Sequence, residues 1–391
     1  MWKSCIEMKK IALFTYSIYS LGGEQRVVSL LANELSKNHD VTIFTMDADD
    51  KNDNLFGLSD KISVRRYHPY NHDAVSYAYR AATHLVPWLV YDIFPKMLER
   101  AYCANEYARL MNELITDDYD TVIVTAWQLS IILGKVKEKY NRSFKAIAWE
   151  HNSYEAYFET KYKNLYKSKS LFIEYIKNID EIVVLAEDYK RKYQDNLGIS
   201  STVIYNAKTF SVVTKSDVLE KTMFACSRIE TSQKGIDLLL SSFKRFCESN
   251  VEWKLCIAGI GSGLEECKKM VHSMGLDERV EFLGQINNVA EWLQKSSIFV
   301  LSSRWEGFPM SVTEAFEVGV PVVAFDIPAM IPFVNSGGAI AAKCYDVDEY
   351  ASLLLQLAND IDTRREMGQK AIEFAKSLSM DDIVKQWEEI L

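Results

Sequence analysis

A stretch in the last quarter of the chain, SSRWEGFPMSVTEAFEVGVPVVAFD, places two carboxylates around the start of a predicted helix. Glu306 stands in the loop before the helix and Glu314 lies inside it, with seven residues between them. The helix is predicted over residues 310–318, with Pro309 suited to its first turn and Gly319 to its C-cap. Because the free N–H groups at a helix N-terminus attract anions, the pattern predicts an anion-binding turn between two carboxylates.

Two cations, Arg228 and Lys234, follow a short apolar run within one loop. Arginine offers a planar fork of donors and lysine a point charge, so the two together suit a diphosphate. Solvated surface charge is the commoner fate of any single Arg or Lys, and that alternative stays open. If both cations face the anion-binding turn, they would stabilise negative charge on a departing group.

The first half of the chain carries two further candidate sites, each directly after a predicted strand. Gly22 and Gly23 open a helix, where bare backbone can approach a phosphate; an ordinary tight turn is an equal alternative. Glu150, His151 and Asn152 end a buried strand, at the sheet edge where ligand-facing residues collect. His151 could donate a hydrogen bond or orient an acceptor near neutral pH, although a lone His is more often structural.

Other chemical patterns are weak or missing in the sequence. Residues 259–263, GIGSG, begin like a dinucleotide fingerprint, but Leu264 stands at the third glycine position. The triplets Asp47-Ala-Asp49 and Asp346-Val-Asp348 lie in polar, loop-like surroundings, and no metal-spaced His/Cys cluster occurs. We therefore expect no cofactor and no metal.

Composition narrows the class of protein. The chain has 391 residues, which favours two domains, and its 48% hydrophobic and 25% charged residues are typical of a globular protein. A net charge of −9 argues against nucleic acid as a partner. Seven scattered cysteines without a C-x-x-C pair indicate a reducing compartment, and the N-terminus lacks the apolar core of a signal peptide. We expect a cytoplasmic protein.

Short apolar runs alternate with helical patterns twice along the chain, which predicts βαβ units and mostly parallel sheets. Strands are predicted at 11–15, 41–45, 62–65, 121–125, 145–149, 181–185 and 202–205, and again at 222–226, 254–258, 280–283, 298–301 and 322–325. We predict an α/β protein with two doubly wound, Rossmann-like domains, over 1–207 and 208–375, and an interdomain cleft that binds ligands. The last residues, 376–391, are predicted to form a helix that returns to the N-terminal domain.

Two segments could touch a membrane. Residues 70–116 form an insertion rich in aromatic side chains, which either packs internally as a helical hairpin or presents an amphipathic surface. Internal packing is the commoner outcome for such stripes. The second segment is a basic stretch in an acidic chain, either a membrane contact or a solvated helix side, made of Lys161, Lys163, Lys167 and Lys169.

Together these residues resemble glycosyltransferase family four, the retaining nucleotide-sugar transferases of GT-B fold. The paired glutamates with their flanking sequence carry most of the resemblance, which runs from about residue 10 to the C-terminus. Arg228 and Lys234-Gly235 match the family's Arg and Lys-Gly positions. The loop GGEQR at residues 22–26 is similar to the GGAER loop of members that build bacterial capsule, O-antigen and lipid-linked oligosaccharides. Ser227, where Gly is usual, and segment 327–345 depart from the family pattern.

The resemblance implies a role for each candidate. The C-terminal domain would bind the donor: Arg228 and Lys234 hold its diphosphate, Glu314 the ribose hydroxyls and Glu306 the transferred sugar. His151 would lie beside the reacting centre and complete a catalytic set with Arg228, Lys234 and Glu306. Further donor contacts are implied for Gly22, Gly23, Gly284, Gln285, Ile286, Gly307, Phe308, Pro309, Met310 and Ser311. The N-terminal domain would bind the acceptor through Glu24, Glu150 and Asn152.

The implied activity is transfer of a hexose or N-acetylhexosamine from a nucleotide sugar, UDP-linked or alternatively GDP-linked, to a saccharide. The acceptor implied is a polyprenyl-diphosphate-linked saccharide at the inner face of the plasma membrane, in surface polysaccharide biosynthesis. Two alternatives share the architecture: a nucleotide-sugar epimerase, and a non-catalytic sugar-binding partner of another transferase. The intact set of glutamates and cations favours the transferase.

Overall fold

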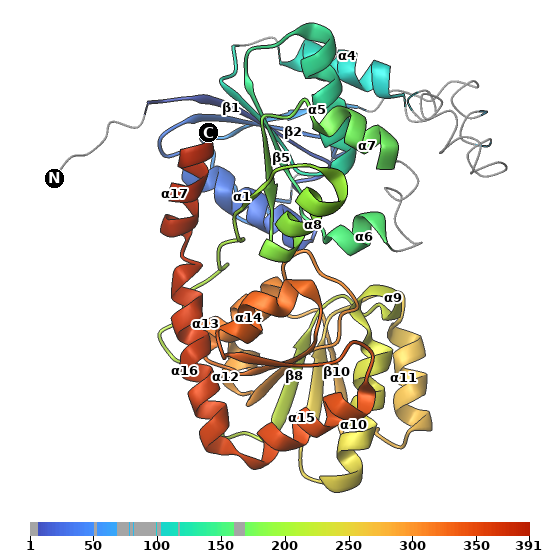
Figure 1. Cartoon of the computed structure of the whole chain (residues 1–391). Coiled ribbons are helices and arrows are strands. Elements are labelled where there is room, and N and C mark those ends of the chain that lie inside the picture. Colours follow the sequence, from blue (N-terminus) through green and yellow to red (C-terminus); the bar gives the residue numbers. More distant parts are fainter. Residues whose placement is uncertain are drawn as a thin grey trace. The chain divides into compact units, whose positions relative to one another are not determined.

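The chain folds into two compact units, each built on a parallel sheet (Figure 1). The computed structural model describes residues 7–50, 53–68, 103–115, 118–159 and 169–391, with the single residues 78, 81 and 99. One unit comprises Met1–Tyr205 and Ile383–Leu391, and the other comprises Asn206–Asp382. The predicted α/β class with two doubly wound domains is confirmed.

Seven parallel strands form the sheet in the described part of the first unit, in the order β3-β2-β1-β4-β5-β6-β7. Their bounds are β1 Lys10–Thr15, β2 Asp40–Thr45, β3 Ser63–Arg66, β4 Thr121–Val124, β5 Lys145–Trp149, β6 Glu181–Val184 and β7 Thr202–Val203. The strand order reverses between β1 and β4. Loops that follow those two strands therefore diverge, and a ligand-binding crevice is expected at this switch point.

Helices cover this sheet, and their described members are α1 Gly23–Leu35, α4 Ala104–Leu114, α5 Trp127–Tyr140, α6 Tyr154–Phe158, α7 Lys169–Ile176 and α8 Glu187–Leu197. Helix α4 is the described end of the predicted 70–116 insertion, and it packs against α5. The rest of the insertion, residues 78, 81 and 99 apart, lies outside the described residues, as do three of the four predicted lysines. The fourth, Lys169, holds its Nζ 5.7 Å from the centre of the Phe158 ring.

The second unit contains a six-stranded parallel sheet in the order β10-β9-β8-β11-β12-β13. Its strands are β8 Thr222–Cys226, β9 Lys254–Ala258, β10 Val280–Gly284, β11 Ile298–Leu301, β12 Val322–Phe325 and β13 Ala339–Ala342. Its helices are α9 Thr231–Lys234, α10 Ile236–Ser249, α11 Leu264–Ser273, α12 Val289–Gln294, α13 Met310–Val318, a 3-10 turn Pro328–Met330, α14 Ile331–Asn335, α15 Val347–Asn359 and α16 Ile361–Ser377. Here the order reverses between β8 and β11, which defines a second switch point.

The edge strand β13 was not predicted from the sequence. Its residues, Ala-Ile-Ala-Ala, are mostly small, whereas strands are recognised by β-branched and aromatic runs. In the structure, all four residues of β13 pair with β12. Gly338 precedes β13, and a Cβ there would lie 2.6 Å from the ring of Phe316, so packing against that ring explains the small residue. Tertiary contacts, rather than the local conformational preference of these residues, therefore stabilise this strand.

The last helix, α17, spans Met380–Ile390, and its final residues belong to the first unit. Trp387 is 1% exposed and packs edge-on against Trp149, with ring centres 4.8 Å apart. Glu388 lies 2.9 Å from Nε2 of the buried His39. Two large aromatic side chains and a hydrogen bond between His39 and Glu388 thus attach this end of the chain to the first sheet. None of the helices in the described ranges is both long and apolar enough to cross a bilayer.

Candidate active site

Loops at the carboxyl edge of the second sheet carry the residues predicted to bind the donor. All strands are parallel, so the loops after β8, β9, β10 and β11 emerge at one edge. Arg228 and Lys234 follow β8, and Glu306 follows β11, the two neighbouring strands of the switch point. The structure therefore brings the predicted cations and the first glutamate together, 72 residues apart in sequence.

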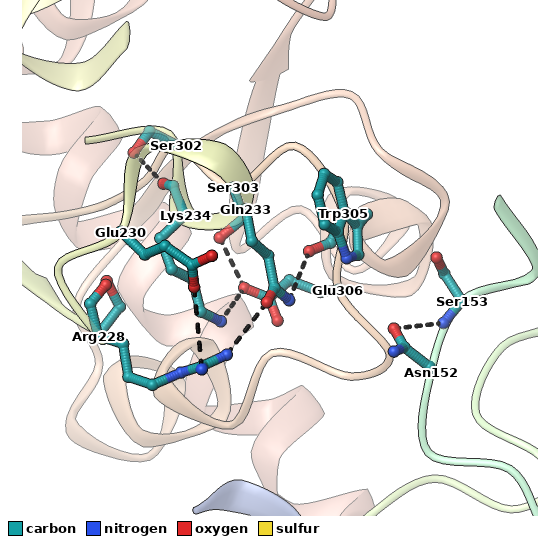
Figure 2. A network of polar contacts seen from close by, with 11 residues as sticks. Asn152, Ser153, Arg228, Glu230, Gln233, Lys234, Ser302, Ser303, Trp305 and Glu306 are labelled. Atoms are coloured by element: carbon teal, nitrogen blue, oxygen red, sulfur yellow. Dashed lines mark hydrogen bonds and ion pairs between the residues drawn. The ribbon is translucent and has the colours of Figure 1, made fainter. Parts of the chain in front are cut away.

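Glu306 and Lys234 form a largely buried ion pair at this edge (Figure 2). Lys234 Nζ lies 2.6 Å from Glu306 Oε1, and the two side chains are 15% and 9% exposed. Ser303 donates a second hydrogen bond to the same oxygen, at 2.6 Å. Ser302 Oγ donates to the backbone oxygen of Lys234, at 2.9 Å. The pair therefore satisfies two charges that burial would otherwise destabilise, and it ties the β11 loop to α9.

Arg228 differs from Lys234 in its exposure. Its side chain is 67% exposed, with Glu230 at 3.8 Å, and its guanidinium donates to Gln233 Oε1 at 3.1 Å. An exposed ion pair of this length contributes little to stability. Arg228 is consequently a cation that solutes can reach, positioned by two neighbours in its own loop (Figure 2).

The glycine-rich loop after β9 supports the segment that carries Arg228. A Cβ on Gly259 would lie 1.8 Å from the Ser227 oxygen, and one on Gly261 would lie 2.1 Å from the Ile229 oxygen. Gly259 also has φ +138°, which L-residues rarely adopt. Ile229 N donates across the loops to the Ile260 oxygen at 2.9 Å. These glycines allow the loops after β8 and β9 to touch. This packing role explains why GIGSG matches the dinucleotide-binding fingerprint only in part.

Helix α13 presents its N-terminus at the same edge, and it begins and ends where the sequence predicted. Pro309 is its N-cap residue, one position before the first turn to which it was assigned. Gly319 caps the other end with φ +84°. Glu314 is 5% exposed and accepts a hydrogen bond of 2.8 Å from Thr209. The first-turn N–H groups, on Met310 and the following residues, are those a helix cannot satisfy internally.

Residues 284–286, for which the resemblance implies donor contacts, lie at the end of β10 beside the glycine-rich loop. Gly284 has φ +66°, and its oxygen accepts a hydrogen bond of 2.8 Å from Gly259 N. Gln285 is exposed, while its neighbours Gly284 and Ile286 are half-buried. The segment is therefore accessible and lies at the same edge as the cations.

The first unit gathers its own polar residues at its switch point. Gly22 is the N-cap of α1 with an extended backbone, φ −178°, which any residue adopts. Glu24 accepts hydrogen bonds from Thr125 at 2.8 Å and Thr15 at 3.5 Å, two residues that follow or end β4 and β1. Burial raises the pKa of Glu24, and the two threonine hydroxyls oppose that shift. Glu24 thus lies at the centre of the crevice expected between these strands.

Glu150, His151 and Asn152 follow β5 at this edge. Glu150 is 1% exposed and accepts a hydrogen bond of 2.6 Å from Ser130; its Oε2 has no partner among the described residues. Burial raises the pKa of Glu150 to about 7, although hydrogen bonds from Ser130 and Tyr157 lower it in part. Burial lowers the pKa of His151 to about 3, so its ring, 4.2 Å from the Trp149 ring, is neutral.

Asp47, part of one D-x-D triplet, holds the loop that leads to Gly22. Its carboxylate accepts hydrogen bonds from Ser17 Oγ at 2.5 Å, Ile18 N at 2.7 Å and Thr45 Oγ1 at 2.8 Å. Burial alone would raise the pKa of Asp47, but these donors lower it overall. Within the described ranges, no three His, Cys, Asp or Glu side chains gather in a way that could hold a metal ion.

Sequence reasoning missed several side chains that organise the second site. Ser303 and Gln233 lie in loops already singled out, and their polar character beside Glu306 and Lys234 was the available signal. Arg304 was missed as well; it forms a two-point ion pair with Asp237, at 2.9 and 2.7 Å, that fixes the β11 loop against α10. The Arg304–Asp237 pairing joins residues 67 positions apart, beyond the range of local patterns.

Two doubly wound units, with cation-bearing loops at the switch point of the second, define a two-domain protein of the GT-B class. The family described as Glycosyltransferase Family 4 matches residues 21–207, and Glycosyl transferases group 1 matches residues 208–374. The chain therefore belongs to the glycosyltransferase family that these two models describe, and it is a glycosyltransferase. Among the three alternatives left by the sequence, the family decides for the transferase.

The chain is similar to other glycosyltransferases over nearly its full length. The chain is 27% identical to an uncharacterized glycosyltransferase of Haemophilus influenzae, over 98% of this chain and 100% of that protein. It is 23% identical to the amylovoran biosynthesis glycosyltransferase AmsD of Erwinia amylovora, over 98% and 100%. A TarM variant from S. aureus, solved with fondaparinux, alpha-GlcNAc-glycerol and UDP, shares the fold with TM-score 0.74 and 16% identity, over 98% and 99%.

Proposed function

We propose that this glycosyltransferase is a retaining hexosyltransferase that uses a nucleotide sugar, with UDP preferred over GDP. The observation that carries the proposal is the Lys234–Glu306 pair beside the accessible Arg228, at the switch point of the second sheet. A diphosphate is the ligand that such a cation pair and a helix N-terminus suit best. UDP in the related TarM complex supports the choice of nucleotide.

In the proposed reaction, the bond between the sugar and the diphosphate breaks, and negative charge builds up on the departing diphosphate. Arg228 and Lys234 would stabilise that charge, together with the N–H groups of residues 307–311. Lys234 would exchange one anionic partner for another, which would leave Glu306 to accept a hydrogen bond from the transferred sugar. Glu314 would accept from the ribose, and the base would lie at 284–286. No metal is needed for this charge balance.

The first unit would supply the acceptor side. Glu24, Glu150 and Asn152 would accept or donate hydrogen bonds to acceptor hydroxyls, with Gly22 and Gly23 bordering the donor diphosphate. The neutral ring of His151 would contact the reacting centre as a hydrogen-bond partner without adding charge. Carboxyl groups held by hydroxyl donors suit a neutral, hydroxyl-bearing ligand.

We further propose that a hexose or N-acetylhexosamine passes to a polyprenyl-diphosphate-linked saccharide in surface polysaccharide biosynthesis, at the cytoplasmic face of the membrane. The name of the AmsD relative, amylovoran biosynthesis, supports a polysaccharide product. Membrane contact rests on the sequence of the 70–116 insertion and the lysines of 161–169. Flotation with anionic liposomes tests it: recovery of the protein with the vesicles is expected, and a protein left at the bottom contradicts it.

The donor proposal is tested by thermal unfolding with UDP, GDP and their sugar conjugates, because a ligand that binds the folded state raises the melting temperature. Transfer to a saccharide acceptor is then measured for Arg228→Ala. Since Arg228 is exposed, the variant should fold normally yet transfer about 100-fold more slowly. The control Lys268→Ala removes an exposed cation of α11, paired with Glu265, and should behave like wild type. An active Arg228→Ala enzyme would contradict the assignment.

A further inference from the structure

The polar connector that opens the second unit, residues 208–221, is bound to helix α13 and to the end of helix α16. Lys208 N donates to the Leu378 oxygen at 2.9 Å, and Ser216 N donates to the Val318 oxygen at 2.9 Å. Between these points, Thr209 Oγ1 donates to Glu314 Oε1 at 2.8 Å. The connector is therefore held beside Glu314.

Glu317 holds this connector in place through its contacts with Lys208, Lys215 and Val212, which we call the Glu317 clamp. Lys208 Nζ lies 2.7 Å and Lys215 Nζ 2.9 Å from its carboxylate, and Val212 N donates to it at 3.1 Å. The Glu317 side chain is 6% exposed, so these contacts are shielded from solvent. Burial alone would raise the pKa of Glu317, but Lys208, Lys215 and Val212 N lower it overall, which keeps the group ionised. The contacts are thus stronger than surface pairs.

Glu314 and Glu317 stand three positions apart on α13, so their side chains occupy adjacent places on the same helix face. The connector runs across that face and contacts both carboxylates. Fixing Val212 and Lys215 on Glu317 limits where Thr209 can lie, since only a few residues separate them. The hydroxyl of Thr209 is consequently held at one oxygen of Glu314, and this limits the rotation of the Glu314 carboxylate.

We propose that Thr209 is a positioning residue for ribose recognition: held by the Glu317 clamp, it orients the Glu314 carboxylate toward the ribose hydroxyls of the donor nucleotide. This inference rests on the proposed donor role of Glu314 and goes beyond it. A carboxylate held by a hydroxyl donor keeps a defined orientation, which strengthens a directional hydrogen bond to a ligand. Selection for ribose would then depend on the connector as well as on α13.

The test compares the binding of UDP and GDP with that of their 2′,3′-dideoxy analogues, by calorimetry, in wild type and in Thr209→Val. The substitution keeps the shape of the side chain and removes the hydroxyl. We expect Thr209→Val to bind UDP about tenfold more weakly, the range for losing a hydrogen bond to a charged group. Binding of the dideoxy analogue should not change, because it lacks the hydroxyls that Glu314 would accept. Thr214→Val, an exposed threonine of the same connector, is the matched control.

A second variant tests the clamp. Glu317→Gln keeps the side chain but loses the charge that holds both lysines, and it should reduce discrimination against the dideoxy analogue in the same direction as Thr209→Val. Glu220→Gln, an exposed glutamate of the connector, is its control. If Glu317→Gln does not fold, Lys215→Met, which removes one partner only, takes its place.

The outcomes separate the two proposals. If Thr209→Val weakened the binding of UDP and of its dideoxy analogue equally, the positioning role would be overturned. Unchanged discrimination between UDP and that analogue would also overturn it. Either result would leave the donor proposal intact. A Glu317→Gln protein with wild-type discrimination would overturn the clamp. A wild-type protein that binds neither UDP nor GDP would overturn the proposed function and, with it, this inference.

Discussion

Buried glutamates of the two units have different partners. In the first unit, Glu24 and Glu150 accept hydrogen bonds from the hydroxyls of threonine and serine. In the second unit, Glu306 pairs with Lys234, and Glu317, near the C-terminal end of α13, pairs with two lysines. Glu314 differs from both, because it accepts a hydrogen bond from the hydroxyl of Thr209. The pKa of Glu150 is raised and that of Glu317 lowered, although both side chains are buried. Burial therefore does not decide the charge; the partner does.

This difference separates the tasks of the two edges. Ionised glutamates that neutralise cations keep those cations in place until an anionic ligand competes for them, which suits a diphosphate site. Glu24 and Glu150, whose pKa values burial raises, present an edge with less negative charge. Such an edge suits a sugar hydroxyl. The comparison therefore favours donor binding in the second unit and acceptor binding in the first.

The glycine loops of the two units provide a second contrast, and substitutions in them should have the largest effect on stability. Gly259→Ala should destabilise the protein by about 4 kcal/mol, because its Cβ would meet the Ser227 oxygen at 1.8 Å and its φ is +138°. Gly22→Ala should change the free energy of unfolding by less than about 1 kcal/mol, because the nearest atom belongs to the flexible Gln25 side chain. Urea denaturation measures both. If Gly22→Ala is stable but inactive, Gly22 serves a ligand and not the fold; equal destabilisation of the two variants would contradict the contrast.

The next effect concerns the ion pair of the second unit. Lys234→Met leaves Glu306 buried without its cation, and the free energy of unfolding should fall by about 3 kcal/mol. The double variant Lys234→Met/Glu306→Gln should recover most of that loss, because neither charge remains. Lys221→Met, which breaks an exposed pair with Glu252, is the control and should have little effect. A double variant no more stable than Lys234→Met would show that the pair is not the cause.

The smallest effect concerns Glu150 and its dependence on pH. Its pKa rises from an ordinary 4.5 to about 7 on folding, so the folded state binds more protons between those values. The stability that this group contributes is full below pH 4.5 and is lost as pH rises through 7. Glu150→Gln removes that loss and should be more stable than wild type by about 2 kcal/mol at pH 8, with no gain at pH 4.

Urea denaturation at several pH values follows this change. A difference between Glu150→Gln and wild type that does not vary with pH would mean that Glu150 is ionised in the folded protein, like Glu317. In that case the proposed contrast between the two edges would be wrong.

Local patterns in the sequence were sufficient for most of the fold. Strands β5, β8, β9, β11 and β12 have the bounds that were predicted, because strands covered on both faces are continuous apolar runs. Helix α13 likewise begins after Pro309 and stops at Gly319, where residue type dictates the backbone. The candidate residues for donor binding also came from sequence, since their loops follow predicted strands.

The partners of those residues were decided only by the tertiary structure. Strand β13 exists because β12 and the space beside Phe316 accept it, not because Ala-Ile-Ala-Ala prefers an extended form. The pairing of Lys234 with Glu306, and of Thr209 with Glu314, joins residues 72 and 105 positions apart. Hydrogen bonds act over about 3 Å, and sequence periodicity does not encode which distant loops share an edge. Chain topology sets that proximity, and with it the hydrogen-bond and ion-pair partners of each glutamate.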